Sequence, residues 1–432
     1  MTMLLSHTGI YRFCLAFAIF TAIADVNSFV GVSEYAVPIK YAYTAIIFIL
    51  MFTYMCKWGV FDTTSPTPVL ALMFFVITSA TFVVNLLLYD TKASYVTAFT
   101  ASLVLAAAIF IPPNSIVFDA VRVLKQLSIV FFVASAFVLL EAILKGTGLI
   151  KNYSYFPDME HVKSIVCVFA ICLSILMDRR VLTCILLLIV AATLVFRPAS
   201  TLIVGLAICI PLSLLLKLRA LGASRAIANT LLVTLIAGPL AFYFFFDDMA
   251  NLVTAAEAYI KVDLLGGDSN TYFRLAILKF AFQALDQSFI YGNGLNGETS
   301  VLLARDFAWW REINQDGFAA IHSDFVVILT QAGIVGYLVF GAFLYLLLSV
   351  RFRMLVDAYR VDQNIGILIS ISIVGIVAFL IYASFNPFLP VYHCSHLVWV
   401  VLFISEMARK SILPGNVFAF SGNPLSPKLQ PA

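Results

Sequence analysis

The chain has 432 residues, of which 62% are hydrophobic and 11% are charged, and its formal net charge is +3. Soluble domains carry about 25% charged residues, so this composition excludes a water-soluble globular protein. The small net charge, with no run of Lys and Arg longer than two residues, argues against a nucleic-acid partner.

Apolar stretches recur along the whole chain, and each is long enough to cross a bilayer core about 30 Å thick as a helix. The strict alternation over about ten residues that a β-barrel strand requires does not occur. The sequence therefore predicts an all-α fold, a polytopic transmembrane helical bundle with about 12 spans. Their predicted centres are Ala18, Ile47, Val76, Leu103, Phe132, Phe169, Leu188, Ala207, Leu235, Phe340, Val374 and Val400.

One connection is much longer than the others. Residues 247–322 form a large loop between the ninth and tenth spans, within a single bundle that covers residues 1–410. The tail, 411–432, is rich in Pro, Gly and Ser, and we expect it to be disordered.

Basic residues give the expected orientation, because cytoplasmic loops of membrane proteins are enriched in Lys and Arg. With both termini in the cytoplasm, short basic loops fall inside and the more acidic large loop falls outside. The inner-loop cations are then Lys57, Arg122, Lys125, Arg179, Arg180, Lys217, Arg219, Arg225, Arg351, Arg353 and Arg360.

The turn between the seventh and eighth spans contains Arg197 and Pro198. Pro198 disfavours helical geometry at Arg197 and suits the first position of a new helix. Arg197 is thus predicted beside a helix N-terminus, whose free N–H groups favour an anion such as phosphate. The alternative is an arginine that extends to lipid headgroups.

The large loop contains a similar pattern. Residues 266–271 are typical of a turn with a capping residue, and residues 272–287 of an amphipathic helix. Arg274 lies in the first turn of that helix, where acidic residues are normally preferred. It either makes a second guanidinium contact with the same anion or pairs with Asp268 at the surface.

Further along the loop, residues 291–297 match a GxGxxG pattern literally, but a dinucleotide site needs a βαβ unit, so a turn is expected. Trp309 and Trp310 either stack on sugar rings or belong to the aromatic belt at the membrane surface.

His322 is predicted at the outer mouth of the tenth span. Neutral imidazole is a natural general base near neutral pH, although a structural histidine is the alternative. Ser323 or Asp324 could cap the helix that follows. His393 and His396 lack a third ligand, so no metal site is predicted, and no motif indicates a cofactor.

Taken in order, these residues resemble the O-antigen ligase and Wzy polymerase superfamily, over roughly residues 185–405. The loop lacks the Arg-x10-Gly element of some Wzy polymerases, because Leu285 and Asp316 stand at that distance from Arg274 and Arg305. The matching positions are Arg197, Arg274, Tyr291-Gly292-Asn293-Gly294, His322-Ser323, Gly333-Ile334-Val335-Gly336 and Asn386-Pro387.

The resemblance implies a membrane-embedded glycosyltransferase of the bacterial inner membrane. It would join oligosaccharide repeat units carried on undecaprenyl diphosphate, by inverting, metal-independent transfer at the periplasmic face. It implies catalytic roles for His322, Arg274 and Arg197. The bilayer, a chain-length regulator and a flippase of the same pathway are the expected partners. The residues expected to contact the substrate are Arg197, Arg274, Ser323, Trp309, Trp310 and Arg305.

Two alternatives stay open from the sequence. The first is a ligase that moves a finished glycan to another acceptor, such as a lipid A core. The second is a lipid-linked glycan transporter or flippase with 12 spans, which predicts two similar halves and charged residues near the middle of the membrane. The single large loop, confined to the second half of the chain, argues against a transporter.

Overall fold

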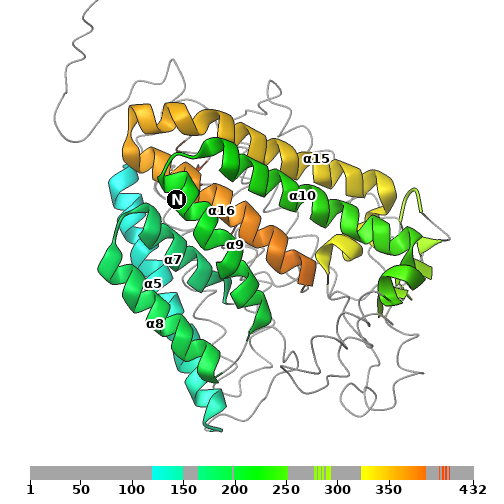
Figure 1. Ribbon diagram of the computed structural model, residues 1–432, viewed down its shortest axis with the longest axis horizontal. Helices are drawn as coiled ribbons and strands as arrows, with labels where there is room; N and C mark the ends of the chain where they lie inside the picture. Colours follow the sequence, from blue (N-terminus) through cyan, green and yellow to red (C-terminus); the bar gives the residue numbers. More distant parts are fainter. Residues whose placement is uncertain are drawn as a thin grey trace, which may run out of the picture.

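The computed structural model describes residues 119–148, 164–196, 199–251 and 323–385, with shorter pieces inside 277–292 and 398–408. Every long regular element in these residues is an α-helix (Figure 1). The predicted spans centred at Ala18, Ile47, Val76 and Leu103 lie outside the described residues, as do most of the large loop and the tail, 411–432, and the span predicted at Val400 is described only in the short pieces inside 398–408.

The long helices are α5 (Ala120–Gly146), α7 (Ile165–Leu176), α8 (Arg180–Phe196), α9 (Ser200–Lys217), α10 (Leu221–Phe244), α15 (Asp324–Val361) and α16 (Gln363–Phe385). Within the described residues, five helices are long and apolar enough to cross a membrane, so this part of the chain is multi-pass. Long apolar runs become helices in lipid because a helix satisfies its backbone hydrogen bonds internally. The five stretches are Ala120–Leu144, Ser200–Lys217, Leu221–Phe244, Ala332–Val361 and Gln363–Phe385.

The centre of the bundle is α16, whose residues from Ile365 to Ala383 are all buried. A helix that is apolar on every side belongs in a core. Near its C-terminal end, the Tyr382 hydroxyl lies 2.8 Å from the Ser164 hydroxyl, and the Tyr382 ring packs against Gly205 of α9. These contacts join α16 to the residue before α7 and to α9.

The connections from α7 to α8 and from α9 to α10 are tight turns. Asp178 and Arg219 adopt left-handed backbone conformations in these turns, with φ of 57° and 58°. The Lys217 ammonium of α9 contacts the Asp178 carboxylate at 2.6 Å, so the two turns lie at the same end of the bundle.

Further contacts bring the other basic segments to this end. The Arg219 guanidinium lies 5.2 Å from the centre of the Tyr359 ring, near the C-terminus of α15. At the opposite end, Gly146 packs against Phe196, so α5 and α8 run in the same direction and end together. We call the end that holds the Asp178 and Arg219 turns the basic end. Its cations are Arg122, Lys125, Arg179, Arg180, Lys217, Arg219, Arg225, Arg353 and Arg360.

One of the predicted inner-loop cations is placed differently. Arg351 was predicted with Arg353 and Arg360 among the cations of an inner loop, but it is buried in α15 with only 4% of its surface exposed. Its guanidinium donates to the Ser372 hydroxyl of α16 at 3.0 Å and to the Ser405 hydroxyl at 3.1 Å. The hydroxyl groups that bind Arg351 therefore come from residues far from it in the sequence.

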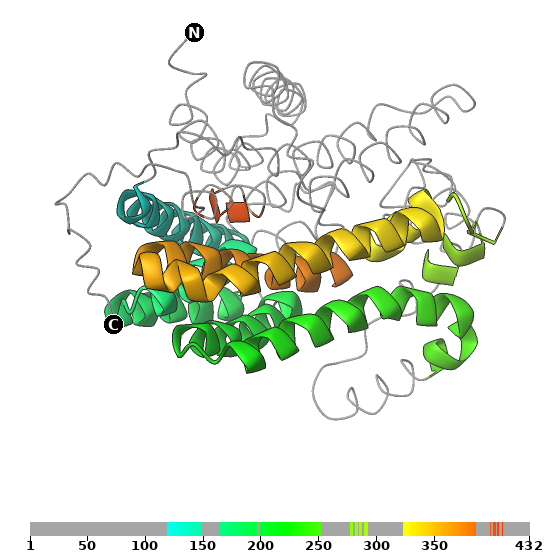
Figure 2. The same ribbon diagram turned by 90° about the horizontal axis from the view of Figure 1, so that it is seen from above.

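The helices converge at the basic end and spread apart toward the other end, which we call the splayed end (Figure 1). Viewed from above, α10 and α15 continue past the end of α16 (Figure 2). These two helices also contact each other, because the Tyr337 hydroxyl donates to the Ile236 carbonyl oxygen at 2.9 Å. Together they form an extension at the splayed end.

The helix α15 is not one straight span. Gly333 interrupts it with φ of 63° and ψ of −173°. The rings of Phe325 and Phe340 lie 6.2 Å apart, whereas a straight helix would place these residues about 22 Å apart. The residues 324–332, here the fold-back segment, therefore turn back along the span that follows.

Candidate functional site

Of the candidate site residues, Ser323 lies within the described part of the chain. Arg197, Arg274, His322, Arg305, Trp309 and Trp310 lie outside the described residues. Several of their sequence neighbours are described, however. Phe196 ends α8 and Ala199 precedes α9, both at the splayed end, and Ser323 precedes the fold-back segment.

The described neighbour of Arg274 is Ile277, which is buried at 2% exposure. The described residues between Ile277 and Leu285 are helical. Phe282 of this stretch meets Tyr243, near the end of α10, with ring centres 5.6 Å apart. This part of the large loop therefore also packs at the splayed end.

The start of the fold-back segment has a defined cap. The Ser323 hydroxyl accepts a hydrogen bond from the Val326 amide at 3.5 Å, so Ser323 is the N-cap residue. Asp324 follows in the first turn, where a carboxylate is favoured by the helix dipole, and it is 1% exposed. Of the two capping residues that the sequence left open, Ser323 makes the cap.

The sequence predicted that the His322-Ser323 step leads into the tenth span, and α15 does begin directly after Ser323, but its first residues are not part of the span. The step leads into the fold-back segment, and the span itself runs from Ala332 to Val361. Phe325 is level with Phe340, which lies on the order of 10 Å along the helix from Gly333. The buried Asp324 carboxylate is thus set back into the bundle from the tip of α15.

Gly333 is where the large loop meets the span. The amide of Ile334 donates to the Phe289 carbonyl oxygen at 2.9 Å, and that of Val335 to the Ile290 carbonyl oxygen at 3.5 Å. The turn at residues 289–292 therefore satisfies the free N–H groups at the start of the span. Two motifs of the resemblance, the aromatic-glycine turn and the Gly-x-x-Gly stretch, are in direct contact.

Glycine is required at this contact. A Cβ atom on Gly333 would collide with the Ile290 carbonyl and lie 2.5 Å from the Gly292 nitrogen. The left-handed φ of Gly333 would add strain to any other residue. The backbone that packs against Gly333 where a side chain would stand belongs to residues 290–292, about forty residues earlier in the sequence.

An aromatic cluster holds the loop to α10. The Tyr243 ring stacks on Phe289, with centres 5.2 Å apart and planes 17° apart. The Tyr243 hydroxyl donates to the Asp286 carboxylate at 2.7 Å. Phe244 meets Phe289 edge-on at 6.0 Å. We call the set of Tyr243, Asp286, Phe289, Gly292 and Gly333 the loop joint.

Sequence reasoning missed the role of Tyr243 and Asp286. It treated the amphipathic helix as an isolated element and assigned it no partner. The available signal was the aromatic run at residues 242–246, which is longer than a membrane belt needs at one helix end.

Among the described residues, no group of three or more His, Cys, Asp or Glu side chains is placed to hold a metal ion. No protein-family model matches the chain, and comparison with curated proteins finds no significant match.

Proposed function

We propose that the protein is a polysaccharide polymerase, a membrane-embedded glycosyltransferase. It joins oligosaccharide repeat units carried on undecaprenyl diphosphate at the periplasmic face. The observation that carries this proposal is that Phe196, Ala199, Ile277 and Ser323 all lie away from the basic end, at the opposite helix ends or in the loop packed there. These residues are the described neighbours of Arg197, Arg274 and His322.

The proposed reaction is a single displacement at the anomeric carbon of the donor sugar. An acceptor hydroxyl oxygen forms the new glycosidic bond, and the bond from that carbon to the diphosphate oxygen breaks. The sugar carbon is inverted, and the lipid diphosphate leaves with the bonding electrons. A diphosphate is a good leaving group, so the step needs no nucleotide.

The three candidate side chains have distinct roles in this step. Arg197 and Arg274 stabilise the charge that develops on the departing diphosphate, which is the larger electrostatic contribution. Neutral His322 accepts the proton of the acceptor hydroxyl, a contribution of about 10² to 10⁴-fold.

The fold-back segment supports this assignment. It begins two residues after His322, and its first turn contains the buried Asp324. A reaction centre next to a buried, apolar segment is shielded from water, which strengthens its electrostatic interactions. The exposed apolar surface of α10, including Val233, suits contact with lipid, where the polyprenyl tail of the substrate would lie.

The test is elongation by the purified protein in lipid nanodiscs. The donor and acceptor are a synthetic repeat unit on a polyprenyl diphosphate, with EDTA present and no nucleotide. We expect products of two, three and more units, with free polyprenyl diphosphate released in equal number to the new linkages.

Other products would replace the proposal. Transfer only to a lipid A core acceptor, with no self-elongation, would identify a ligase. Movement of the intact lipid-linked unit across a vesicle bilayer, with no new linkage, would identify a transporter.

A further inference from the structure

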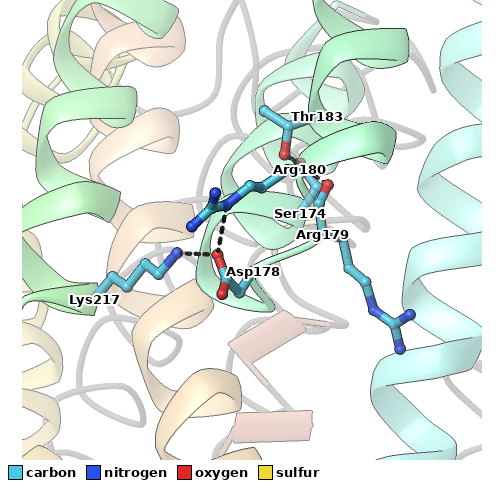
Figure 3. A network of polar contacts seen from close by, with 6 residues as sticks. All are labelled: Ser174, Asp178, Arg179, Arg180, Thr183 and Lys217. Atoms are coloured by element: carbon cyan, nitrogen blue, oxygen red, sulfur yellow. Dashed lines mark hydrogen bonds and ion pairs between the residues drawn. The ribbon is translucent and has the colours of Figure 1, made fainter.

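The turn between α7 and α8 gathers charge at the basic end. The Asp178 carboxylate lies 2.6 Å from the Lys217 ammonium and 3.8 Å from Nε of Arg180 (Figure 3). Figure 3 also shows Arg179 pointing away from Asp178. The Ser174 and Thr183 hydroxyls, 2.7 Å apart, join α7 to α8 behind the turn.

This cluster has more positive than negative charge. The Lys217 ammonium, through its hydrogen bond and its charge, holds the pKa of the Asp178 carboxyl below its ordinary value. The charge of Arg180 makes a smaller contribution in the same direction. The carboxylate is therefore ionised at neutral pH and offsets one of three cations. The Arg180 side chain is 90% exposed, so its charge is available to another anion.

An apolar stripe continues from the same turn along α8. Val181, Ile185, Leu188 and Val195 are spaced to share one face of the helix, and each is exposed. Val181 is 75% exposed and Leu188 71%. On α9, Leu214 and Leu218 are exposed beside Lys217. A membrane helix turns such a stripe toward lipid acyl chains.

The two features together fit one kind of molecule. Cations at the end of an exposed apolar stripe match a phospholipid, with its phosphate at the turn and its chains along the helix. An excess of positive charge favours a lipid whose headgroup has a net negative charge over a zwitterionic one.

We propose that the α7–α8 turn, with Lys217, is a binding site for an anionic phospholipid. The headgroup contacts Arg180, Arg179 adds to the positive charge of the turn, and the acyl chains lie along the Val181–Val195 stripe. Asp178 competes with the headgroup for Arg180 and Lys217. This site is separate from the splayed end and does not depend on the proposed polymerase activity.

The test is native mass spectrometry of the full-length protein, released from mixed micelles of phosphatidylglycerol and phosphatidylcholine with identical chains. We expect the wild type to retain phosphatidylglycerol preferentially. Loss of one cation from a lipid site weakens binding about fivefold. The double variant Arg179→Ala/Arg180→Ala is therefore expected to lose about 25-fold in this preference.

The matched control is Arg353→Ala/Arg360→Ala, which removes the same charge elsewhere at the basic end. It should keep the preference. Asp178→Asn is the reverse test, because it removes the competing carboxylate, and asparagine accepts the left-handed φ at this position. We expect it to strengthen phosphatidylglycerol retention about fivefold.

Equal retention of the two lipids by the wild type would overturn the site. An equal loss in the site variant and the control variant would also overturn it, because total charge alone would then explain the binding. A weaker preference in Asp178→Asn would contradict the competition between Asp178 and the headgroup.

Discussion

The ring of Phe325 lies 6.2 Å from the ring of Phe340, although the two residues are 15 positions apart in the sequence and on opposite sides of Gly333. The reversal at Gly333 makes this contact possible, and the turn at residues 289–292 occupies the outer side of the reversal. The large loop, the fold-back segment and the span thus meet at one backbone position. The proposed chemistry depends on this arrangement, because only Ser323 separates His322 from the fold-back segment.

Gly333→Ala is expected to destabilise the protein by about 1–3 kcal/mol, from the left-handed backbone and the collision with the Ile290 carbonyl. Thermal unfolding in detergent measures this effect. Gly238→Ala in α10 is the control, because nothing lies within 4 Å of its added Cβ and its φ is ordinary. Equal melting temperatures for the two variants would show that the joint does not require a glycine.

Tyr243→Phe removes one hydroxyl and keeps the ring stacked on Phe289. The lost hydrogen bond to Asp286 should cost about 0.5–1.5 kcal/mol, or somewhat more because its acceptor is charged. Asp286→Asn and the double variant complete a mutant cycle by thermal unfolding. We expect the two changes to be non-additive, since they affect the same bond. Strictly additive effects would mean that the contact does not stabilise the loop joint.

Arg351→Met keeps a long side chain and removes the hydrogen bonds that join α15 to α16 and to Ser405. Hydrogen bonds to charged groups contribute about 1.5–3 kcal/mol, so a loss of that size is expected in unfolding experiments. Arg353→Met, two residues along and exposed, should change stability by less than about 0.5 kcal/mol. Similar losses in both variants would contradict a special role for the buried guanidinium.

Acid should break the contact between Lys217 and Asp178 only at low pH. The pKa of Asp178 is lower in the folded protein than its ordinary value of 3.8, so folding favours the ionised carboxylate. This stabilisation is complete above the unfolded pKa and is lost as the pH falls through the lower, folded pKa. The melting-temperature difference between wild type and Asp178→Asn should therefore be constant at pH 5–8 and shrink below about pH 4. A difference that already declines at pH 6 would assign the titration to another group.

Hydropathy was enough to locate the helices. The predicted centres Phe132, Leu188, Ala207, Leu235 and Val374 fall within α5, α8, α9, α10 and α16. A long apolar run forms a helix in lipid because a helix satisfies its own backbone hydrogen bonds. The shared position of the basic turns also followed from charge alone. The side of the membrane on which they lie stays a prediction.

The fold-back and the buried arginine could not be predicted in the same way. Gly333 has the sequence context of an ordinary packing glycine, and its conformation depends on residues 289–292, which reach it only in the folded chain. Arg351 looked like its neighbour Arg353 because the hydroxyls of Ser372 and Ser405 that bind it are remote in sequence. Local patterns predict elements, and long-range contacts decide how they bend and which charges they bury.

The most direct test is the initial rate of repeat-unit elongation by purified single variants Arg197→Ala, Arg274→Ala and His322→Ala, with Arg353→Ala at the basic end as the control. We expect each of the three to be slower by about 10² to 10⁴-fold, while the control retains the wild-type rate and all four insert normally. A wild-type rate in any of the three variants would remove that side chain from the reaction, and wild-type rates in all three would contradict a shared site at the splayed end.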